Sequence, residues 1–359
     1  MSARVRELAV RRYPALSIHL EKLEVATRSA LTVAIGAAVL YWAGRTDLTM
    51  YVMFGAFTAV YGSNERYRVR IRSVTAGGVG ILAAIAVGMV LSRYQVGNVW
   101  LVAVAALMLV PGCLLTAAFQ LVPAQPFFQM IALTGCASIP VATEGRLRLA
   151  VAVGSVALAW TLTMAGWLLR RRSNTSAGPL RDVLFKTLQR EPEFRPGAVA
   201  DWQVWATVLR NVLAVVTAGL IAVGANGGRP YWAMIVTVAT LPPTWMPHRF
   251  GRVAQRITGT VVGVLLAGAL LSAHLPLGAA LSVIVVSQFM IELTVIRLYA
   301  VACVFITTLV FTAQSLALPG AQHYLPERLL ETAIGCVVAV SYMSATVWLR
   351  RLRRNEQPS

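Results

Sequence analysis

Long stretches without a charged residue are the feature that most limits what this chain can fold into. The longest contains 50 residues between Arg93 and Glu144, and another contains 35 residues between Arg256 and Glu292. A helix that crosses a bilayer needs roughly 20 residues, and a charge at mid-membrane costs about 3 kcal/mol or more. These runs therefore predict membrane-spanning helices, two in each of the longest runs.

Composition agrees with a membrane protein, because 57% of the residues are hydrophobic and only 13% are charged. The net charge of +18 comes from short basic clusters beside apolar runs, which argues against a nucleic-acid-binding surface. Cys113, Cys136, Cys303 and Cys336 lie inside apolar segments without paired spacing. They are predicted to be small buried side chains, with no disulfide, metal site or cofactor.

The second half of the chain repeats the first with a shift of about 181 residues. Residues 75–80 align with 258–263, residues 167–172 align with 348–351, and Arg28 aligns with Arg210. The predicted fold is an all-α integral membrane protein with two repeats of about six transmembrane helices, about twelve in total. The expected helices cover residues 27–44, 48–63, 73–92, 99–121, 126–141, 149–169, 208–225, 231–247, 257–273, 277–293, 298–318 and 329–349.

The distribution of Lys and Arg predicts the orientation, because positively charged loops stay in the cytoplasm. With the N-terminus inside, 26 of the 32 Lys and Arg residues fall on the cytoplasmic side. Six helices per half return the linker and the C-terminus to that side, so the repeats are expected to be parallel. The predicted division is a basic cytoplasmic segment (1–26), a first bundle (27–172), a linker (173–206), a second bundle (207–350) and a basic tail (351–359).

The linker contains several Gly and Pro residues and mixed charges, so it is too polar to span. Residues 180–189 are expected either to form an amphipathic surface helix or to remain a solvated connector.

Arginines and prolines near helix ends are the candidates for a substrate path. A guanidinium group binds carboxylate through two hydrogen bonds, and a helix N-terminus adds partial positive charge. Prolines free backbone carbonyls, which membrane proteins tolerate where a cavity or other protein surrounds them. Ordinary positive flanks and a plain turn are the alternatives. The candidates are Arg28, Arg72, Arg210, Arg256, Pro242 and Pro243.

No catalytic residues are expected, because the four histidines are scattered and no zinc-protease, nucleophile-elbow or Walker motif is present. The carboxylates avoid the predicted helix centres, and only Glu292 and Glu331 lie near helix ends. Since proton relays usually keep a carboxylate at membrane depth, this pattern favours an anion path over a relay. An enzyme is the least favoured class.

Three segments of the second half carry a family resemblance. They are Tyr231-Trp-Ala-Met-Ile-Val-Thr-Val with Pro242, then Gln255-Arg-Ile-Thr-Gly-Thr-Val-Val-Gly263, and Arg328-Leu-Leu-Glu-Thr-Ala-Ile-Gly335. Residues 208–350 resemble the fusaric acid resistance protein family, and the first half does so only through the repeat. The positions that match the family are Tyr231, Trp232, Arg256, Gly259, Thr260, Gly263, Arg328, Glu331 and Thr332.

The resemblance implies an inner-membrane transporter class that includes aromatic carboxylic acid exporters and, more remotely, plant malate channels. The expected function is efflux or facilitated passage of small organic anions, aromatic carboxylates among them, through the cell membrane. The alternative is a non-transporting scaffold that recruits anionic lipid or partner proteins. The expected partners are the lipid bilayer and the anion, without nucleic acid, and the oligomeric state is open.

Overall fold

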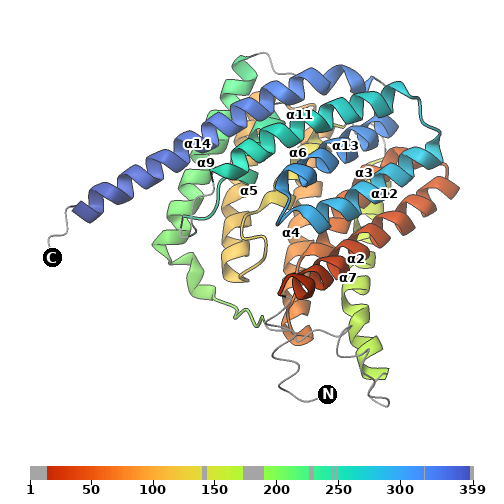
Figure 1. Ribbon diagram of the computed structural model, residues 1–359, viewed down its shortest axis with the longest axis horizontal. Coiled ribbons are helices and arrows are strands. Elements are labelled where there is room, and N and C mark those ends of the chain that lie inside the picture. The colour runs from red at the N-terminus through yellow and green to blue at the C-terminus, as the bar shows by residue number, and fades with distance from the viewer. Residues whose placement is uncertain are drawn as a thin grey trace.

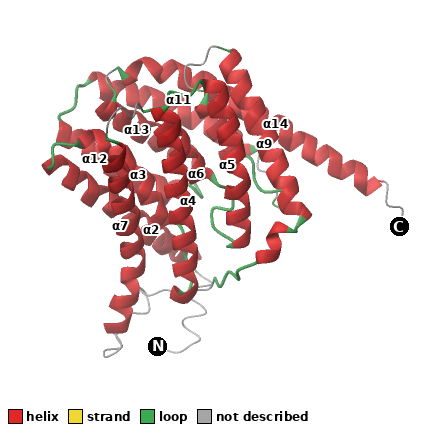
Figure 2. Ribbon diagram, turned by 180° about the vertical axis from the view of Figure 1, so that it is seen from behind, coloured by secondary structure: helices red, strands yellow, loops and turns green. Residues whose placement is uncertain are grey.

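The computed structural model describes residues 14–139, 144–172, 190–225, 230–244, 246, 250–318 and 320–355. This part of the chain is helical, and its β-structure is limited to one isolated bridge between Glu65 and Arg190 (Figure 2). The segment 180–189, which the sequence predicts to be either an amphipathic surface helix or a solvated connector, lies outside the described residues.

In the part of the chain that the structure describes, twelve α-helices follow the order of the twelve expected segments. The first half contains α2 (Pro14–Trp42), α3 (Thr49–Ala56), α4 (Tyr67–Arg93), α5 (Asn98–Ala118), α6 (Phe127–Ala137) and α7 (Gly145–Arg172). The second half contains α9 (Trp202–Gly224), α10 (Tyr231–Thr240), α11 (Gly251–Ser272), α12 (Leu277–Thr294), α13 (Tyr299–Ala317) and α14 (Leu325–Asn355).

Among the described residues, nine helices are long and apolar enough to cross a membrane. The other three, α3, α6 and α10, are shorter than expected, with 8, 11 and 10 residues. Helix α10 ends at Thr240 instead of near residue 247, because Pro242 and Pro243 follow and the residue before a proline is disfavoured in the α conformation. Most residues of the three short helices are buried, so these helices form the centre of the molecule.

The apolar surface of the long helices faces outward. Leu265 of α11, Leu107 of α5 and Leu209 of α9 are 69%, 68% and 60% exposed. On α9 the next residues, Arg210 and Asn211, are buried. Polar side chains inside and leucines outside reverse the arrangement of a water-soluble helix, and this is the pattern expected when lipid is the solvent.

Helices from the two halves are interleaved. Within the first half, α4 packs against α6 and α3 packs against α7, and within the second half α11 packs against α13 and α10 against α14. Between the halves, α5 packs against α9, and α12 packs against α2, where the two lie side by side in Figure 1. The short helix α6 contacts α10, and α3 contacts α13. One apolar core therefore joins both halves.

The start of the molecule's linker is outside the described residues, but its end is attached to the first half. Arg190 donates from Nη1 to Glu65 Oε1 at 2.9 Å and from Nη2 to the carbonyl of Gln120. The backbone N–H of Arg195 donates to the carbonyl of Ala118 at 2.9 Å. These contacts tie the linker to the turn before α4 and to the end of α5.

Candidate functional site

Two arginines lie in the interior of the second half. Arg256 of α11 and Arg328 of α14 are each 1% exposed. The two helices that carry them, α11 and α14, pack against each other. Because burying an unpaired charge is costly, two buried guanidinium groups need hydrogen-bond acceptors or opposite charges that replace their lost hydration.

The protein satisfies these two guanidinium groups only in part. Arg256 donates from Nη1 to the hydroxyl of Tyr299 at 2.8 Å, and its Nε has no hydrogen-bond partner. Arg328 has its Cζ 3.7 Å from the ring centroid of Trp232, a cation–π contact, while its Nε and Nη1 have no partner. These three nitrogens can donate to an acceptor that the described part of the protein does not supply.

One buried carboxylate acts on this pair of arginines. Glu331, one turn after Arg328 on α14, is 0% exposed and attracts the Arg328 charge. Its Oε2 already accepts a hydrogen bond from the backbone N–H of Trp232 at 3.2 Å. With two guanidinium groups and one carboxylate, the site carries an excess positive charge, so it suits a monoanion.

Polar side chains continue beyond Arg328. Tyr231 and Trp232 lie side by side with ring centroids 5.1 Å apart. Gln314 of α13 donates from Nε2 to the Tyr231 hydroxyl at 3.4 Å, and its Oε1 is buried without a partner. The aromatic rings at the start of α10 therefore lie beside hydrogen-bonding groups.

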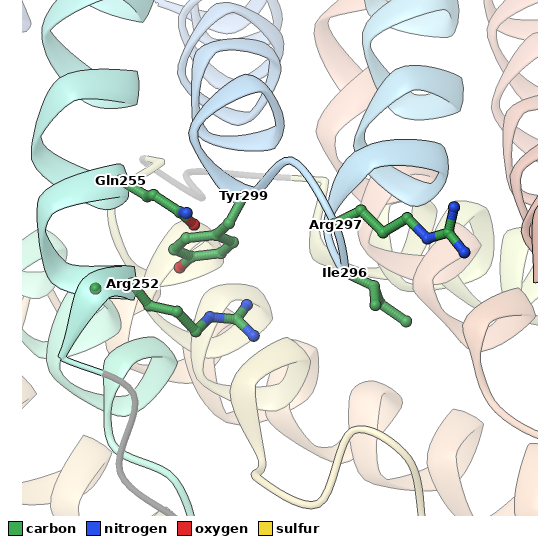
Figure 3. A pocket seen from close by; sticks show the side chains of 6 residues that line it. Arg252, Gln255, Ile296, Arg297 and Tyr299 are labelled. Atoms are coloured by element: carbon green, nitrogen blue, oxygen red, sulfur yellow. The ribbon is translucent and has the colours of Figure 1, made fainter. Parts of the chain in front are cut away.

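A cavity of about 280 Å³ opens beside Tyr299, at the N-terminal ends of α11 and α13. Figure 3 shows Arg252 reaching under the Tyr299 ring, whereas the Arg297 side chain points away from it. The Arg252 Cζ lies 4.1 Å from the ring centroid of Tyr299. The lining residues are Gly251, Arg252, Gln255, Ile296, Arg297 and Tyr299.

The two glycines of the α11 motif bring α11 against α13. A Cβ on Gly259 would lie 2.2 Å from the carbonyl oxygen of Ala300, and a Cβ on Gly263 would lie 2.8 Å from Cβ of Thr307. Thr260 between them is buried. The motif therefore explains the close approach that places the hydroxyl of Tyr299 at Arg256.

Arg28 and Arg210, both predicted for the substrate path, make similar contacts within their own halves. Arg28 donates from Nε to the carbonyl of Ala59 at 2.6 Å, just after α3, and pairs with Glu24 at 3.3 Å. Arg210 donates to the carbonyl of Pro242, just after α10. Each arginine therefore satisfies backbone carbonyls at the end of a short helix, away from the Arg256 and Arg328 pair.

The other predicted path residues are not brought to the arginine pair. Arg72 is exposed on α4, and Arg70, two residues earlier, is the buried one at 1% exposure. Arg70 pairs with Glu24 at 3.4 Å and lies 4.7 Å from the ring centroid of Tyr67. Pro242 is half-buried and Pro243 is buried at the turn after α10.

Several residues of the site were not predicted from the sequence. Arg252 and Tyr299 are 47 positions apart, and only the packing of α11 on α13 brings them together. Arg148 of α7 lies 5.8 Å from the ring centroid of Tyr51, which resembles the contact of Arg328 with Trp232. The alignment of the halves contained this signal, because it pairs residue 51 with residue 232.

Glu292 of α12 is also buried, at 3% exposure, and is attracted by Lys22 and Arg28 of α2. Among the described residues no group of three or more His, Cys, Asp or Glu side chains could hold a metal ion. All four cysteines are buried and free.

Comparison with known proteins confirms the family resemblance of the second half. Residues 204–342 match the family described as fusaric acid resistance protein-like. The chain is 32% identical over 174 residues to the uncharacterized protein YhfK of Escherichia coli (strain K12), covering 47% of this chain and 24% of YhfK. It is 30% identical over 166 residues to the uncharacterized membrane protein YvaC of Bacillus subtilis (strain 168), covering 43% and 26%.

A further match, 29% identical over 153 residues, is the uncharacterized protein ORF2 of Neisseria gonorrhoeae, with 42% of this chain and 36% of that protein covered. The aligned parts thus span between about a quarter and a third of these relatives. No solved structure matches the chain. The apolar helices and the membrane-protein relative together identify a multi-pass membrane protein.

Proposed function

We propose, from the match of residues 204–342 to the fusaric acid resistance protein-like family, that this protein exports small organic anions. Among such anions, aromatic carboxylates fit the site best, because Arg328 can bind the carboxylate and Trp232, on which Arg328 is stacked, can contact the aromatic ring. The observation that carries the proposal is the pair of buried arginines, Arg256 and Arg328, whose N–H groups are only partly satisfied. A carboxylate can accept from such groups through two oxygens.

The membrane potential supplies a driving force in the proposed direction. A potential that is negative inside favours outward movement of a monoanion by about 2.3 kcal/mol per 100 mV. Export of a monoanion therefore requires neither ATP nor a proton relay. The proposed location is the cell membrane, with both termini in the cytoplasm, as the distribution of Lys and Arg predicts.

We further propose that the two halves are parallel repeats, so that the twelve helices form two related bundles. Equivalent helix pairs support this relation: α4 with α6 and α11 with α13, and α5 with α9 and α12 with α2. In this arrangement the second bundle holds the anion site, and the first bundle has a similar contact, between Arg148 and Tyr51, although the alignment places Arg146 opposite Arg328.

The test is flux of labelled benzoate in vesicles that contain the purified protein and carry an imposed potential. We expect flux to follow the potential and to fall about tenfold or more in Arg256→Ala, because a hydrogen bond to a charged group contributes about 1.5–3 kcal/mol. Arg256→Lys keeps the charge but loses the two-pronged geometry, so it should recover only part of the flux. Arg93→Ala, at the exposed end of α4, is the matched control and should transport normally.

Flux that ignores the potential and is unchanged in a folded Arg256→Ala protein would contradict the proposal. A scaffold protein would give that result.

A further inference from the structure

The cavity beside Tyr299 has the chemistry of an anion-binding site. Arg252 and Arg297 line it with Gln255, and its lining contains no carboxylate among the described residues. The Nε of Arg252 is buried without a hydrogen-bond partner in the described part of the chain. A volume of about 280 Å³ is just below the usual range for ligand pockets, roughly 300–1,000 Å³. The lining therefore favours a small anion over a cation or a bulky apolar ligand.

Tyr299 stands between this cavity and the buried arginine pair. Its ring lines the cavity, and the guanidinium group of Arg252 lies against one face of this ring, with Cζ 4.1 Å from the ring centroid (Figure 3). Its hydroxyl accepts a hydrogen bond from Arg256, at 2.8 Å. The side chain is 5% exposed. Tyr299 is thus held by one arginine from the cavity side and by another from the interior.

The interior behind Tyr299 contains a free thiol. Cys303 lies one turn after Tyr299 on α13, is 2% exposed, and packs against Gly259 of α11, three residues after Arg256: a Cβ added at Gly259 would lie 2.7 Å from the Cβ of Cys303. A reagent that reacts with Cys303 must therefore enter the compartment that contains the two buried arginines.

We propose that the cavity is the loading site for a small organic monoanion with a carboxylate or sulfonate group, and that Tyr299 is the gate to the buried arginines. The proposal rests on the proposed function. An arriving carboxylate competes for Arg252 and Arg256, the two groups that hold Tyr299. Because guanidinium binds carboxylate more strongly than it binds a neutral hydroxyl or a ring, the anion itself releases the gate.

The experiment measures the rate at which Cys303 is modified by the anionic thiol reagent 2-sulfonatoethyl methanethiosulfonate. The full-length protein is purified in detergent, with Cys113, Cys136 and Cys336 replaced by Ala. We expect modification to be about fivefold or more faster in Tyr299→Phe, which loses only the bond from Arg256, since such a bond contributes about 1–2 kcal/mol. Tyr299→Ala removes the ring as well, so modification of Cys303 should be faster still in this variant.

A reagent of opposite charge distinguishes an anion path from a simple opening. The trimethylammonium analogue of the reagent should modify Cys303 more slowly than the sulfonate reagent in each of these proteins, because Arg252, Arg256 and Arg328 repel it. Equal rates for both reagents would overturn the anion preference of the cavity.

Cys136 provides the matched control thiol. It lies in α6 of the first half and is 0% exposed. In a chain that keeps Cys136 alone, Tyr299→Phe should leave its modification rate unchanged. Equal Cys303 rates with Tyr, Phe and Ala at position 299 would overturn the gate, and so would equal acceleration of Cys136 and Cys303 by Tyr299→Phe.

These results are independent of the flux measurement. If Cys303 responds as expected while vesicles show no benzoate flux, the gated site stands and the transport proposal fails. If flux depends on Arg256 while the modification rate of Cys303 does not depend on residue 299, the transport proposal stands and the gate proposal fails.

Discussion

Arg328 has a charged group in the apolar interior, and two of its nitrogens make no hydrogen bond within the protein. A residue kept for stability would not be left so poorly paired, because replacement of buried charged groups by apolar residues is often neutral or stabilising. Its contact with Trp232, at 3.7 Å, contributes about 2 kcal/mol or more because both side chains are buried, and this offsets only part of the cost of burying the charge. This balance argues for a role in ligand binding.

We therefore expect Arg328→Met combined with Glu331→Gln, which leaves no buried carboxylate without its partner, to keep the melting temperature in detergent near that of the unmodified protein and to lower benzoate flux about tenfold or more. Thermal unfolding and vesicle flux of the same preparations would measure both effects. A large fall in melting temperature with normal flux would instead assign Arg328 a structural role.

Glu65 is a titratable residue outside the spanning helices. It is 0% exposed, and burial raises its pKa above the ordinary value of 4.5, although Arg190 opposes the shift. The folded protein therefore favours the protonated carboxyl. Its contribution to stability is fully present below the pKa of the unfolded chain and is lost as the pH rises through the pKa of the folded chain.

The prediction is that the melting temperature of the unmodified protein falls more between pH 4 and pH 7 than that of Glu65→Gln, which cannot titrate. Melting curves across this pH range provide the measurement. Parallel pH profiles for the two proteins would contradict the assignment.

At the scale of single elements, α11 and α13 depend on close backbone contact. A Cβ added at Gly259 would meet backbone, the carbonyl oxygen of Ala300 at 2.2 Å, which cannot move aside as a side chain can. On the same helix, the nearest atom to a Cβ at Gly268 is the Leu325 side chain at 3.5 Å, an ordinary van der Waals distance.

We expect Gly259→Ala to destabilise the protein by about 1–3 kcal/mol, the usual effect of overpacking, and to disturb the contact of Tyr299 with Arg256. Gly268→Ala should be tolerated. Melting temperatures of the two variants, with flux at a temperature where both are folded, would compare them. Equal effects of the two substitutions would show that helix propensity, not the contact with α13, determines the outcome.

At the scale of the whole molecule, the two halves are joined because helices of one half pack against helices of the other. Ser29 of α2 accepts a hydrogen bond from Gln288 of α12 at 2.8 Å, and Asn211 of α9 donates to Gln125, in the turn just before α6, at 2.7 Å. All four side chains are buried. Interhelical hydrogen bonds in membranes contribute only about 0.6 kcal/mol on average. These two bonds therefore contribute little to stability, and their main effect is to fix how the helices of the two halves are aligned with each other.

The orientation of the whole molecule is testable with cysteines at exposed positions, because the native cysteines are buried. Gln95, in the turn after α4, and Glu193, in the linker, are both exposed. In intact cells an impermeant thiol reagent should label Gln95→Cys and should reach Glu193→Cys only after the membrane is permeabilised. Labelling of Glu193→Cys in intact cells would reverse the orientation predicted from the positive loops.

The sequence by itself determined the membrane class, the order of the helices and the family motif of the second half. These depend on local properties: charge cannot lie in lipid, and prolines end helices where they occur. It also marked Arg256 and Arg328, but it could not separate Arg72 from Arg70. Residues two apart on a helix point about 200° apart, and only the neighbouring helices decide which side is buried.

The tertiary structure decided which distant residues meet. Tyr299 reaches Arg252 and Arg256 only because glycines allow α11 and α13 to approach, and the short helices α3, α6 and α10 are buried where helices of both halves meet. Such contacts join residues far apart in sequence, so no local pattern records them. The long uncharged runs determine that the chain spans a membrane. The packing of the helices determines which charged side chains are buried within it.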